Sequence, residues 1–475
     1  MLLNNVCLLL GVISTWFTIV RGLSLTGDRT LIIYDSKYIN RFYSNNNSNL
    51  DLDEEDDSVI DSEKIFEEKF SQFLCLLESN DYNYKLYDIN NGEDEDLQII
   101  KVDDSLYDNV IIFPISKTSL KSGSTPSKGK LLLSSKNLLS FFNDYNGNLM
   151  IVTSPDINNA ESLTYSLNQF GIYPAPKNQV VRDYFQDNNE KLLVPSSNLL
   201  NKYVYTVEGK DTIFNLGNSS IAKLDNRAQL VPILKASKTS FIPSNSQEKK
   251  FEPWVVGSQG YLISGFQGVN NNARLIWLGS SDLLCNCNNK VNQDLIENLI
   301  NWNFNAKSVI KSLNSRHYHS DSKLSYNALN YKVNDLINYE IDITEWDGSK
   351  WIPFISNDIQ FELRQVDPYY RINLTHKTNV GNKTFAIYTT NDFKLPNRHG
   401  MFKFITEYER NGLSSIKDED IKAIRHLAND EYPRSWEITN DWVYLAANAV
   451  VIVSFIAFVI LFLTNTNVTP LKKNN

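Results

Sequence analysis

The feature that most constrains this chain is a run of 22 residues without a charge, from Trp442 to Leu463. As a helix rising about 1.5 Å per residue, the run would cover about 33 Å, enough to cross a hydrocarbon core of about 30 Å. Lys472 and Lys473 follow it, and positive charge favours the cytoplasmic side. The sequence therefore predicts a single-pass type I membrane protein, with a span at 442–463 and a cytosolic tail at 464–475.

A second apolar run lies at the N-terminus. Val6 to Val20 holds 15 uncharged residues, which is short for a bilayer, and the small residues Gly22 and Ser24 follow it. This layout is typical of a secretory signal peptide, so residues 1–24 are predicted to be removed and the body to enter the lumen. The alternatives are a buried N-terminal strand and an anchor helix.

The C-terminus carries a second targeting feature. Lys472 and Lys473 are the fourth-last and third-last residues of the short tail. That is the placement of the dilysine signal that returns proteins to the endoplasmic reticulum (ER), an address read by receptors rather than an anchor. The alternative is that the two lysines only orient the span. Their placement favours a resident of the ER membrane.

Glycosylation signals agree with a lumenal body. Four Asn-x-Ser/Thr sequons precede the span and are predicted glycosylation sites: Asn46, Asn218, Asn373 and Asn382. A fifth sequon, at Asn467, lies in the predicted cytosolic tail and should stay unmodified.

The cysteines are too few for a disulfide-built scaffold. Cys7 would leave with the signal peptide, and the mature chain would keep Cys75, Cys285 and Cys287. An odd number of cysteines in an oxidising compartment predicts at least one free or intermolecular thiol.

Residues 25–305 alternate between apolar runs and helical periodicity. Strands are predicted at 31–34, 84–89, 110–113, 149–153, 261–266 and 274–278, and helices at 65–77, 138–142, 159–170 (ended by Gly171) and 291–303. This alternation favours a Rossmann-like or flavodoxin-like α/β domain, with a parallel sheet covered by helices on both faces. A β-rich excursion is expected around 200–260. An acidic, Asn-rich insertion at 43–61 is predicted to be disordered, the alternative being a cation or partner site.

Residues 306–440 have a different texture. Short aromatic or β-branched runs predict strands at 341–346, 359–363, 370–374, 385–388 and 402–408. Turn residues such as Asp347-Gly348 and Asn411-Gly412 separate them. This spacing predicts a β-sandwich-like domain. Ser414 to Pro433 is expected to be a connection that leads to the span.

The sequence lacks complete catalytic or cofactor motifs. The net charge of −9 argues against nucleic-acid binding. No G-x-G-x-x-G follows a predicted strand, the stretch at 123–130 is one residue too long for a P-loop, and G-x-S-x-G and H-E-x-x-H do not occur. No catalytic residue, cofactor or metal is therefore predicted.

Two sets of residues are candidate exceptions. His317 and His319 could place two imidazoles on one face of a strand, but they lack a third ligand at a usual spacing, so a surface pair is the favoured interpretation. Asp35 and Asp282, at predicted strand ends, are the candidate acid/base carboxylates of a glycosidase-like alternative.

The span itself carries residues suited to helix packing. Ala447, Ser454 and Ala457 fall on one helical stripe, and small side chains let a neighbouring helix approach closely. Asn448 lies six residues past Trp442, where an amide needs a partner. The alternative is that Asn448 reaches headgroups or water. The pattern predicts that the span is an assembly surface as well as an anchor.

Several segments resemble one protein family. They are Leu31–Ser36, Tyr107–Pro114, Phe141–Thr153, Gly260–Ser280, Val366–Leu374, Phe393–Gly412 and Glu431–Arg434, followed by the dilysine terminus. Gly260–Ser280 is the most distinctive, with Asn271-Asn272-Ala273-Arg274 before its second strand. Together they resemble the large type I subunit of the ER oligosaccharyltransferase, the 48-kDa-subunit family that includes the wheat-germ-agglutinin-binding subunit of yeasts. The loop at 144–148 is poorer in glycine than the family's loop.

This resemblance implies a non-catalytic subunit of the complex that transfers a preassembled oligosaccharide from dolichyl diphosphate to Asn in sequons of nascent proteins. It places the chemistry and the divalent metal on another, multispanning subunit. The implied partners are that subunit and the rest of the complex, with the translocon and the oligosaccharide as further candidates. Two other classes fit the topology: a lectin-like or cargo receptor cycling between ER and Golgi, and a lumenal glycosidase.

The predicted topology can be checked in sealed microsomes. Protease added outside should remove only the tail beyond about Leu463, because the span shields everything before it. A glycosidase should lower the mass by the glycans of up to four sequons. Microsomes opened with detergent serve as the control, and a glycan on Asn467 would contradict the orientation.

Overall fold

The structure is a computed structural model that describes residues 24–39, 62–90, 100–101, 104–116, 133–177, 179–185, 192–207, 212–242, 253–286, 289–320, 330–377, 384–432 and 441–465. Several predicted features lie outside these residues: the signal peptide up to residue 23, the insertion at 43–61, the stretch at 123–130, Asn46, Asn382, Cys287, Asn467, Lys472 and Lys473. We call residues 24–306 the α/β unit and residues 309–432 the β-rich unit.

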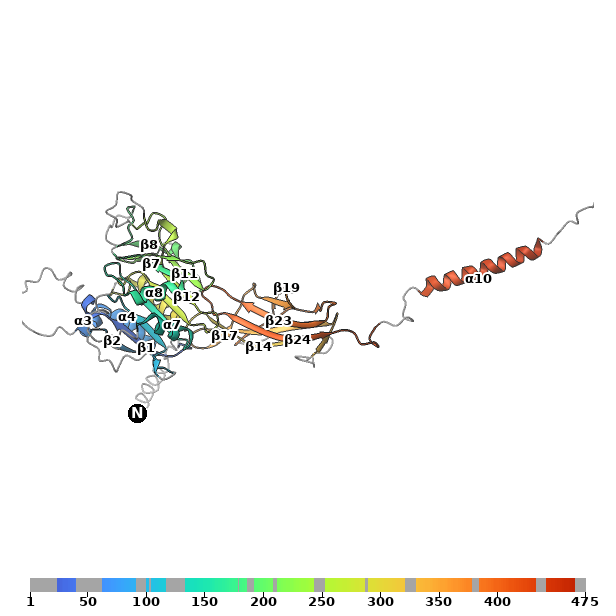
Figure 1. The fold of residues 1–475 in the computed structure, drawn as a ribbon, viewed down its shortest axis with the longest axis horizontal. Helices are drawn as coiled ribbons and strands as arrows, with labels where there is room; N and C mark the ends of the chain where they lie inside the picture. The colour runs from blue at the N-terminus through green and yellow to red at the C-terminus, as the bar shows by residue number, and fades with distance from the viewer. Residues whose placement is uncertain are drawn as a thin grey trace, which may run out of the picture.

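A nine-stranded sheet forms the centre of the α/β unit (Figure 1). Five neighbouring strands run parallel, in the order β2 (Asn83–Asp88), β1 (Arg29–Tyr34), β5 (Asn109–Ile112), β6 (Asn148–Val152) and β13 (Arg274–Leu278). The rest is antiparallel: β12 (Tyr261–Gln267), β11 (Leu230–Lys235), β10 (Ala222–Leu224) and β7 (Ile172–Pro174). The expected parallel sheet is therefore correct for its first half, and an antiparallel half extends it.

Helices cover both faces of this sheet, as expected. They are α3 (Ser62–Lys69), α4 (Ser71–Ser79), α7 (Ser135–Asn143), α8 (Glu161–Phe170) and α9 (Lys290–Asn303). Successive residues of a strand point to opposite faces. Ile32 of β1 packs in a core with α3, α4 and α9, whereas Leu31 packs in a second core with α7 and α8. Because both faces are buried, the central strands read as continuous apolar runs.

Local signals explain several helix ends. The Ser134 hydroxyl accepts a hydrogen bond from the backbone N–H of Asn137 at the start of α7. Gly171 ends α8 with φ of 84°, a left-handed conformation that favours glycine.

The helix predicted at 65–77 is two helices, α3 and α4, with Phe70 between them. The predicted β-rich excursion contains β8 (Leu193–Pro195), β9 (Ile213–Asn215), β10 and β11; β3 (Ile100–Lys101) and β4 (Asp104–Ser105) form a separate small ladder.

Two sheets share one core in the β-rich unit. The first contains β14 (Val309–His319), β16 (Leu336–Trp346), β17 (Trp351–Pro353), β20 (Thr375–His376), β21 (Ala386–Thr389) and β22 (Phe393–Lys394). The second has the order β15 (Asn330–Lys332), β24 (Ile416–Arg425), β23 (Gly400–Tyr408), β18 (Gln360–Arg364) and β19 (Pro368–Asn373). Rings from the two sheets meet in the core, for example Tyr339 and Phe361, with centroids 4.5 Å apart.

One expectation for this unit was wrong. Ser414 to Pro433 is not simply a connection, because β24 occupies Ile416–Arg425 and pairs with β23 along its length. The strand was not predicted because its sequence is rich in charged residues. Two of these charges have partners in the fold: Asp418 hydrogen-bonds with Tyr339, and Asp420 hydrogen-bonds with His317.

The last element is α10 (Asp441–Thr464), a helix long and apolar enough to cross a membrane, with every residue exposed. It coincides with the predicted span. Figure 1 shows the long strands of the β-rich unit extending away from the α/β unit, on the side toward α10.

Candidate functional site at the junction of the two units

The two carboxylates considered for acid/base chemistry hold loops in place. Asp35 is fully buried after β1, and its carboxylate accepts hydrogen bonds from Asn90 Nδ2 (2.7 Å) and from the backbone N–H of Ser116 (3.1 Å). Asp282, after β13, accepts from the backbone N–H of Asn218 (3.0 Å). Each carboxylate therefore stabilises a neighbouring loop through these hydrogen bonds.

These carboxylates belong to a polar edge formed by the carboxyl ends of the parallel strands, the usual place for ligands in open α/β sheets. Tyr38 Oη and Ser281 Oγ lie 3.0 Å apart there, and burial raises the pKa of Tyr38. Asp88 is buried at the end of β2, and one of its oxygens, Oδ2, has no hydrogen-bond partner. Among the described residues, no three His, Cys, Asp or Glu side chains come together as a metal site.

The junction between the units is organised by Arg274, the last residue of the distinctive Asn-Asn-Ala-Arg stretch. Its side chain is fully buried. Nη1 donates to the carbonyls of Trp302 (2.6 Å) and Lys307 (2.7 Å), and Nη2 donates to the carbonyl of Ser308 (2.7 Å). The guanidinium also lies 4.8 Å from the Trp302 ring centroid. Burial lowers the pKa of Arg274 to about 9, so it remains protonated at neutral pH.

The amides next to Arg274 extend this network. Asn148 Oδ1 accepts from the backbone N–H of Arg274 (3.1 Å) and from Asn305 Nδ2 (3.2 Å). Asn272 has a φ of 54°, and its Oδ1 accepts from the backbone N–H of Ser415 (3.1 Å) in the β-rich unit. The Asn residues therefore connect the amino ends of the central strands to both the connecting segment and the second unit.

Three more hydrogen bonds cross the junction at the turn between β23 and β24. Trp302 Nε1 donates to the carbonyl of Gly412 (2.8 Å), and Asn201 Nδ2 donates to the carbonyl of Asn411 (2.7 Å). Ser415 Oγ donates to the carbonyl of Val269 (2.6 Å). These contacts fix the turn against α9, the loop at Asn201 and the loop that follows β12.

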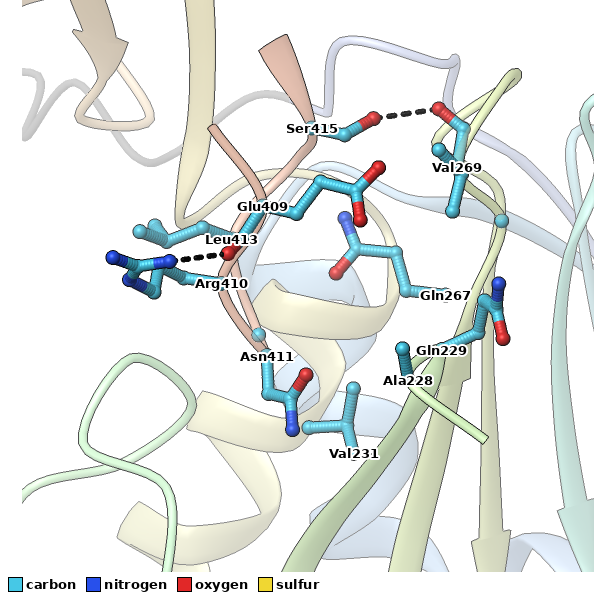
Figure 2. Close-up of a pocket in the computed structure, with 12 residues that line it drawn as sticks. Ala228, Gln229, Val231, Gln267, Val269, Glu409, Arg410, Asn411, Leu413 and Ser415 are labelled. Carbon is cyan, nitrogen blue, oxygen red and sulfur yellow. Dashed lines mark hydrogen bonds between the residues drawn. The ribbon is translucent and has the colours of Figure 1, made fainter. Parts of the chain in front are cut away.

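A cavity of about 140 Å³ opens between this turn and those strands (Figure 2). Its polar walls include Gln229, Gln267, Glu409 and Asn411, and its apolar walls include Ala228, Val231, Val269 and Leu413. Figure 2 shows the Gln267 amide near the middle of the group, with Asn411 on one side and Gln229 on the other. The cavity joins residues from the resembling segments Gly260–Ser280 and Phe393–Gly412. It is the strongest candidate site among the described residues.

The predicted histidine pair is not a surface pair. His317 is buried: its Nδ1 hydrogen-bonds with Tyr331 Oη, and its Nε2 lies 3.0 Å from Asp420 Oδ2. The ring of His319 also packs against the ring of Tyr331, with the two centroids 4.9 Å apart. Burial lowers the pKa of His317, against the opposing effect of Asp420. The prediction failed because Asp420, which satisfies the buried ring, is distant in sequence.

The remaining predicted sites are spread over the molecule. Asn218 and Asn373 are both exposed, Asn218 in a turn and Asn373 at the end of β19. Cys75 is exposed, and Cys285 is half-buried, with its Sγ donating to the carbonyl of Ser281 (3.6 Å). Ala447, Asn448, Ser454 and Ala457 lie on α10, where Ser454 Oγ donates to its own helix at the Val451 carbonyl (2.9 Å).

Sequence reasoning missed the cavity residues Gln229, Gln267, Glu409 and Asn411. They form no motif, because two come from the α/β unit and two from a turn far along the chain. The only available signal was indirect: two of the resembling segments contribute residues to the cavity.

Replacing Arg274 should destabilise the fold strongly. In Arg274→Met, the three backbone carbonyls lose their donors in a buried site, and each unpaired group costs about 1–3 kcal/mol. Thermal unfolding of the full chain in detergent, followed by tryptophan fluorescence, should show a large fall in Tm. The control is Arg227→Met, at an exposed arginine, which should change stability by about 0.5 kcal/mol or less. Equal effects of the two variants would contradict the proposed role.

His317 should make stability fall in mild acid. Its folded pKa is lowered, so below the ordinary value of about 6.5 the unfolded chain binds more protons than the folded chain. The stabilising effect of the neutral ring is therefore present above that pH and is lost as the pH falls. The loss of Tm between neutral and acidic pH should be smaller in His317→Gln than in the parent. The exposed control His399→Gln should retain the parental loss, and equal slopes in all three proteins would refute the assignment.

Comparison with known proteins supplies the family. The family model described as "OST48, N-terminal domain" matches residues 58–306, and "OST48 middle domain" matches residues 317–466. The Saccharomyces cerevisiae protein "Dolichyl-diphosphooligosaccharide--protein glycosyltransferase subunit WBP1" is 46% identical over 401 residues, which cover 84% of this chain and 89% of that protein.

More distant relatives agree. The wbp1 subunit of Schizosaccharomyces pombe is 27% identical, over 86% of this chain and 92% of its own length. The 48 kDa subunit of Danio rerio is 29% identical, over 78% of this chain and 84% of its own length. The resemblance found in the sequence is thus confirmed: the chain belongs to the OST48 family.

Proposed function

We propose that this chain is a structurally required, non-catalytic subunit of an oligosaccharyltransferase complex. That complex would transfer a preassembled oligosaccharide from dolichyl diphosphate to Asn-X-Ser/Thr sequons of nascent proteins. The observation that carries the proposal is the 46% identity to a relative named as a subunit of this glycosyltransferase, over 84% of the chain. The two-unit body followed by one apolar helix fits such a subunit.

We infer that the transfer chemistry lies on another, multispanning subunit. The carboxylates at the strand ends support this inference, because Asp35 and Asp282 are committed to hydrogen bonds that order adjacent loops. The described residues also hold no cluster of three or more metal-binding side chains that could serve a divalent ion.

The finer fold assignment is part of the proposal. The parallel strands have the chain order 2-1-3-4-5, which is that of flavodoxin-like sheets, so we assign residues 25–305 to a flavodoxin-like α/β domain. The two sheets with a common core support a β-sandwich-like domain at 306–440. In the ER membrane, both domains would lie in the lumen, and Lys472 and Lys473, in the cytosolic tail, would act as a signal for retrieval to the ER.

The span is the proposed contact with partner subunits. All residues of α10 are exposed, so its stripe of Ala447, Ser454 and Ala457 is available to another helix. In lipid, close packing and shared hydrogen bonds drive association, because burial from water contributes nothing there. A hydrogen bond from Asn448 to a partner helix would contribute about 0.6–2 kcal/mol.

Co-purification in increasing detergent tests both assembly and the span. The parent should retain a stable set of oligosaccharyltransferase subunits. Asn448→Leu should insert normally but lose partners at lower detergent, and adding Ala447→Leu and Ser454→Leu should weaken the complex further by steric exclusion. Val453→Leu is the matched control within α10.

The outcomes separate the alternatives. Parental chain that purifies alone would exclude the subunit function, and capture of a glycan-dependent cargo instead would favour a receptor. If the triple variant keeps its partners as tightly as the parent, the span is only an anchor and assembly lies in the two units before it.

A further inference from the structure

We infer that one end of the β-rich unit rests on the lumenal surface of the membrane, with the tip of the β18–β19 hairpin among the lipid headgroups. This is the end at which the chain leaves the unit: β24 finishes there, and Tyr432 is the last described residue before α10 (Figure 1). We call it the exit end. The inference rests on the proposal that α10 spans the membrane, and it does not depend on assembly with other subunits.

Strand pairing brings several loops together at the exit end. β24 finishes beside the start of β23, because the two strands pair antiparallel along their length. β18 also runs antiparallel to β23, so the turn from β18 to β19, at 365–367, lies at the same end. A Cβ on Gly400 would come within 2.6 Å of Gln365 Nε2, so this turn touches the first residue of β23. The turn from β15 to β16 joins them there, since Asn334 Nδ2 donates to Asn397 Oδ1 (3.3 Å).

The exit end exposes large apolar side chains. Val366, at the tip of the hairpin, is 88% exposed, the highest fraction of any large hydrophobic residue in the described part of the chain. Most of the exposed large hydrophobic residues described in the β-rich unit lie at or next to this end: Leu336, Val366, Tyr369, Tyr370, Met401 and Tyr432. Clustered exposure of this kind marks a protein or membrane interaction site.

The hairpin presents its tip on a rigid base. Glu362 of β18 pairs with Arg371 of β19 (2.7 Å), and the Tyr369 ring lies 6.1 Å from the core ring of Phe402. Tyrosine is favoured at membrane interfaces, because its ring is apolar and its hydroxyl is polar. A valine tip followed by Tyr369 and Tyr370 therefore suits a segment whose tip reaches the acyl boundary while its rings stay among the headgroups.

The length of the chain keeps the exit end near the bilayer. Residues 433–440 separate Tyr432 from Asp441, the first residue of α10, and these nine steps reach at most about 32 Å when fully extended. Trp442 and Tyr444 begin α10 and would lie at the lumenal interface in the proposed topology. A tethered surface meets its partner at a high effective concentration, so even a weak apolar contact with the headgroup region is populated.

Charge favours a bilayer contact that does not depend on anionic lipid. The charged residues described at the exit end are balanced in sign: Lys332, Lys394, Arg398 and Arg425 against Asp335, Asp367, Asp430 and Glu431. Two of the cations, Lys332 and Arg425, already pair with Glu431. Surfaces that recognise anionic lipids carry a surplus of Lys and Arg. The exit end therefore fits zwitterionic headgroups, which its apolar and aromatic side chains can enter.

Fluorescence quenching of the full chain in phosphatidylcholine vesicles tests the inference. A fluorescent amino acid replaces Val366 in one protein and Ile355 in the matched control. Ile355 is 67% exposed and precedes Ser356, which contacts Tyr408 at the opposite end of β23. Lipids that carry a nitroxide near the headgroup should quench the label at 366 at least about twofold more strongly than the label at 355. High salt should leave this difference unchanged.

A second reporter removes the effect of the label itself. The fluorescent amino acid is placed at Asn397, an exposed position of the exit end, and Val366 stays available for substitution. Val366→Asp should reduce the quenching at 397, because a carboxylate at the tip opposes entry into the interface. Ile355→Asp is the matched control and should leave the quenching unchanged. Both side chains are exposed, so neither substitution disturbs the core.

The outcomes distinguish this inference from the proposals above. A label in place of Tyr444 reports insertion of α10, and equal quenching at 366 and 355 in an inserted chain would overturn the inference. Quenching that needs anionic lipid and is lost in salt would also overturn it. So would a label at 366 that lipid does not quench but the assembled complex shields from aqueous iodide, because a partner protein would then cover the tip. Absence of quenching at 444 would refute the span together with this contact and leave the family assignment intact.

Discussion

A buried guanidinium fixes the segment that connects the two units of this protein. Taking a charge out of water is costly, and Arg274 offsets that cost through three carbonyl acceptors and an aromatic face. The Trp302 carbonyl belongs to the last turn of α9, and the carbonyls of Lys307 and Ser308 belong to the short segment between α9 and β14. The planar guanidinium donates to them from two nitrogens in a fixed geometry, whereas the ammonium of a lysine would act as a single point charge. Since β14 pairs with β16 along most of its length, the orientation of the β-rich unit follows from this segment.

At the same junction, some polar groups form hydrogen bonds between the units and others do not. Backbone carbonyls of the β23–β24 turn accept hydrogen bonds from the side chains of Trp302 and Asn201. The Ser415 hydroxyl donates a hydrogen bond to the carbonyl of Val269. The side chains of Gln267 and Glu409 are not used in this way. The contacts therefore fix the backbone of this turn, whereas the exposed side chain of Glu409 stays free to change its conformation.

Local patterns predicted much of the fold but little of the candidate site. The parallel strands were predictable because both faces are buried, which makes runs such as β5 apolar throughout. β24 was not, because Asp420 on its inner face pairs with a buried His317 that lies 103 residues earlier. The cavity residues were not predictable for the same reason: their proximity depends on Arg274 and the contacts around it. Periodicity reports which residues are buried and not which distant residues meet.

The length of β23 separates the cavity from the end of the β-rich unit that leads to α10. Gly400 pairs with Ile424 close to where the chain leaves β24 for the span, and Tyr408, at the other end of the strand, is followed directly by the cavity residues. From Gly400 to Tyr408 there are eight residue-to-residue rises of about 3.4 Å, so these two ends of β23 are about 27 Å apart. Eight residues, 433–440, separate the β-rich unit from α10 in the sequence. The cavity therefore lies at the end of β23 that is remote from the connection to α10, on the side of the α/β unit.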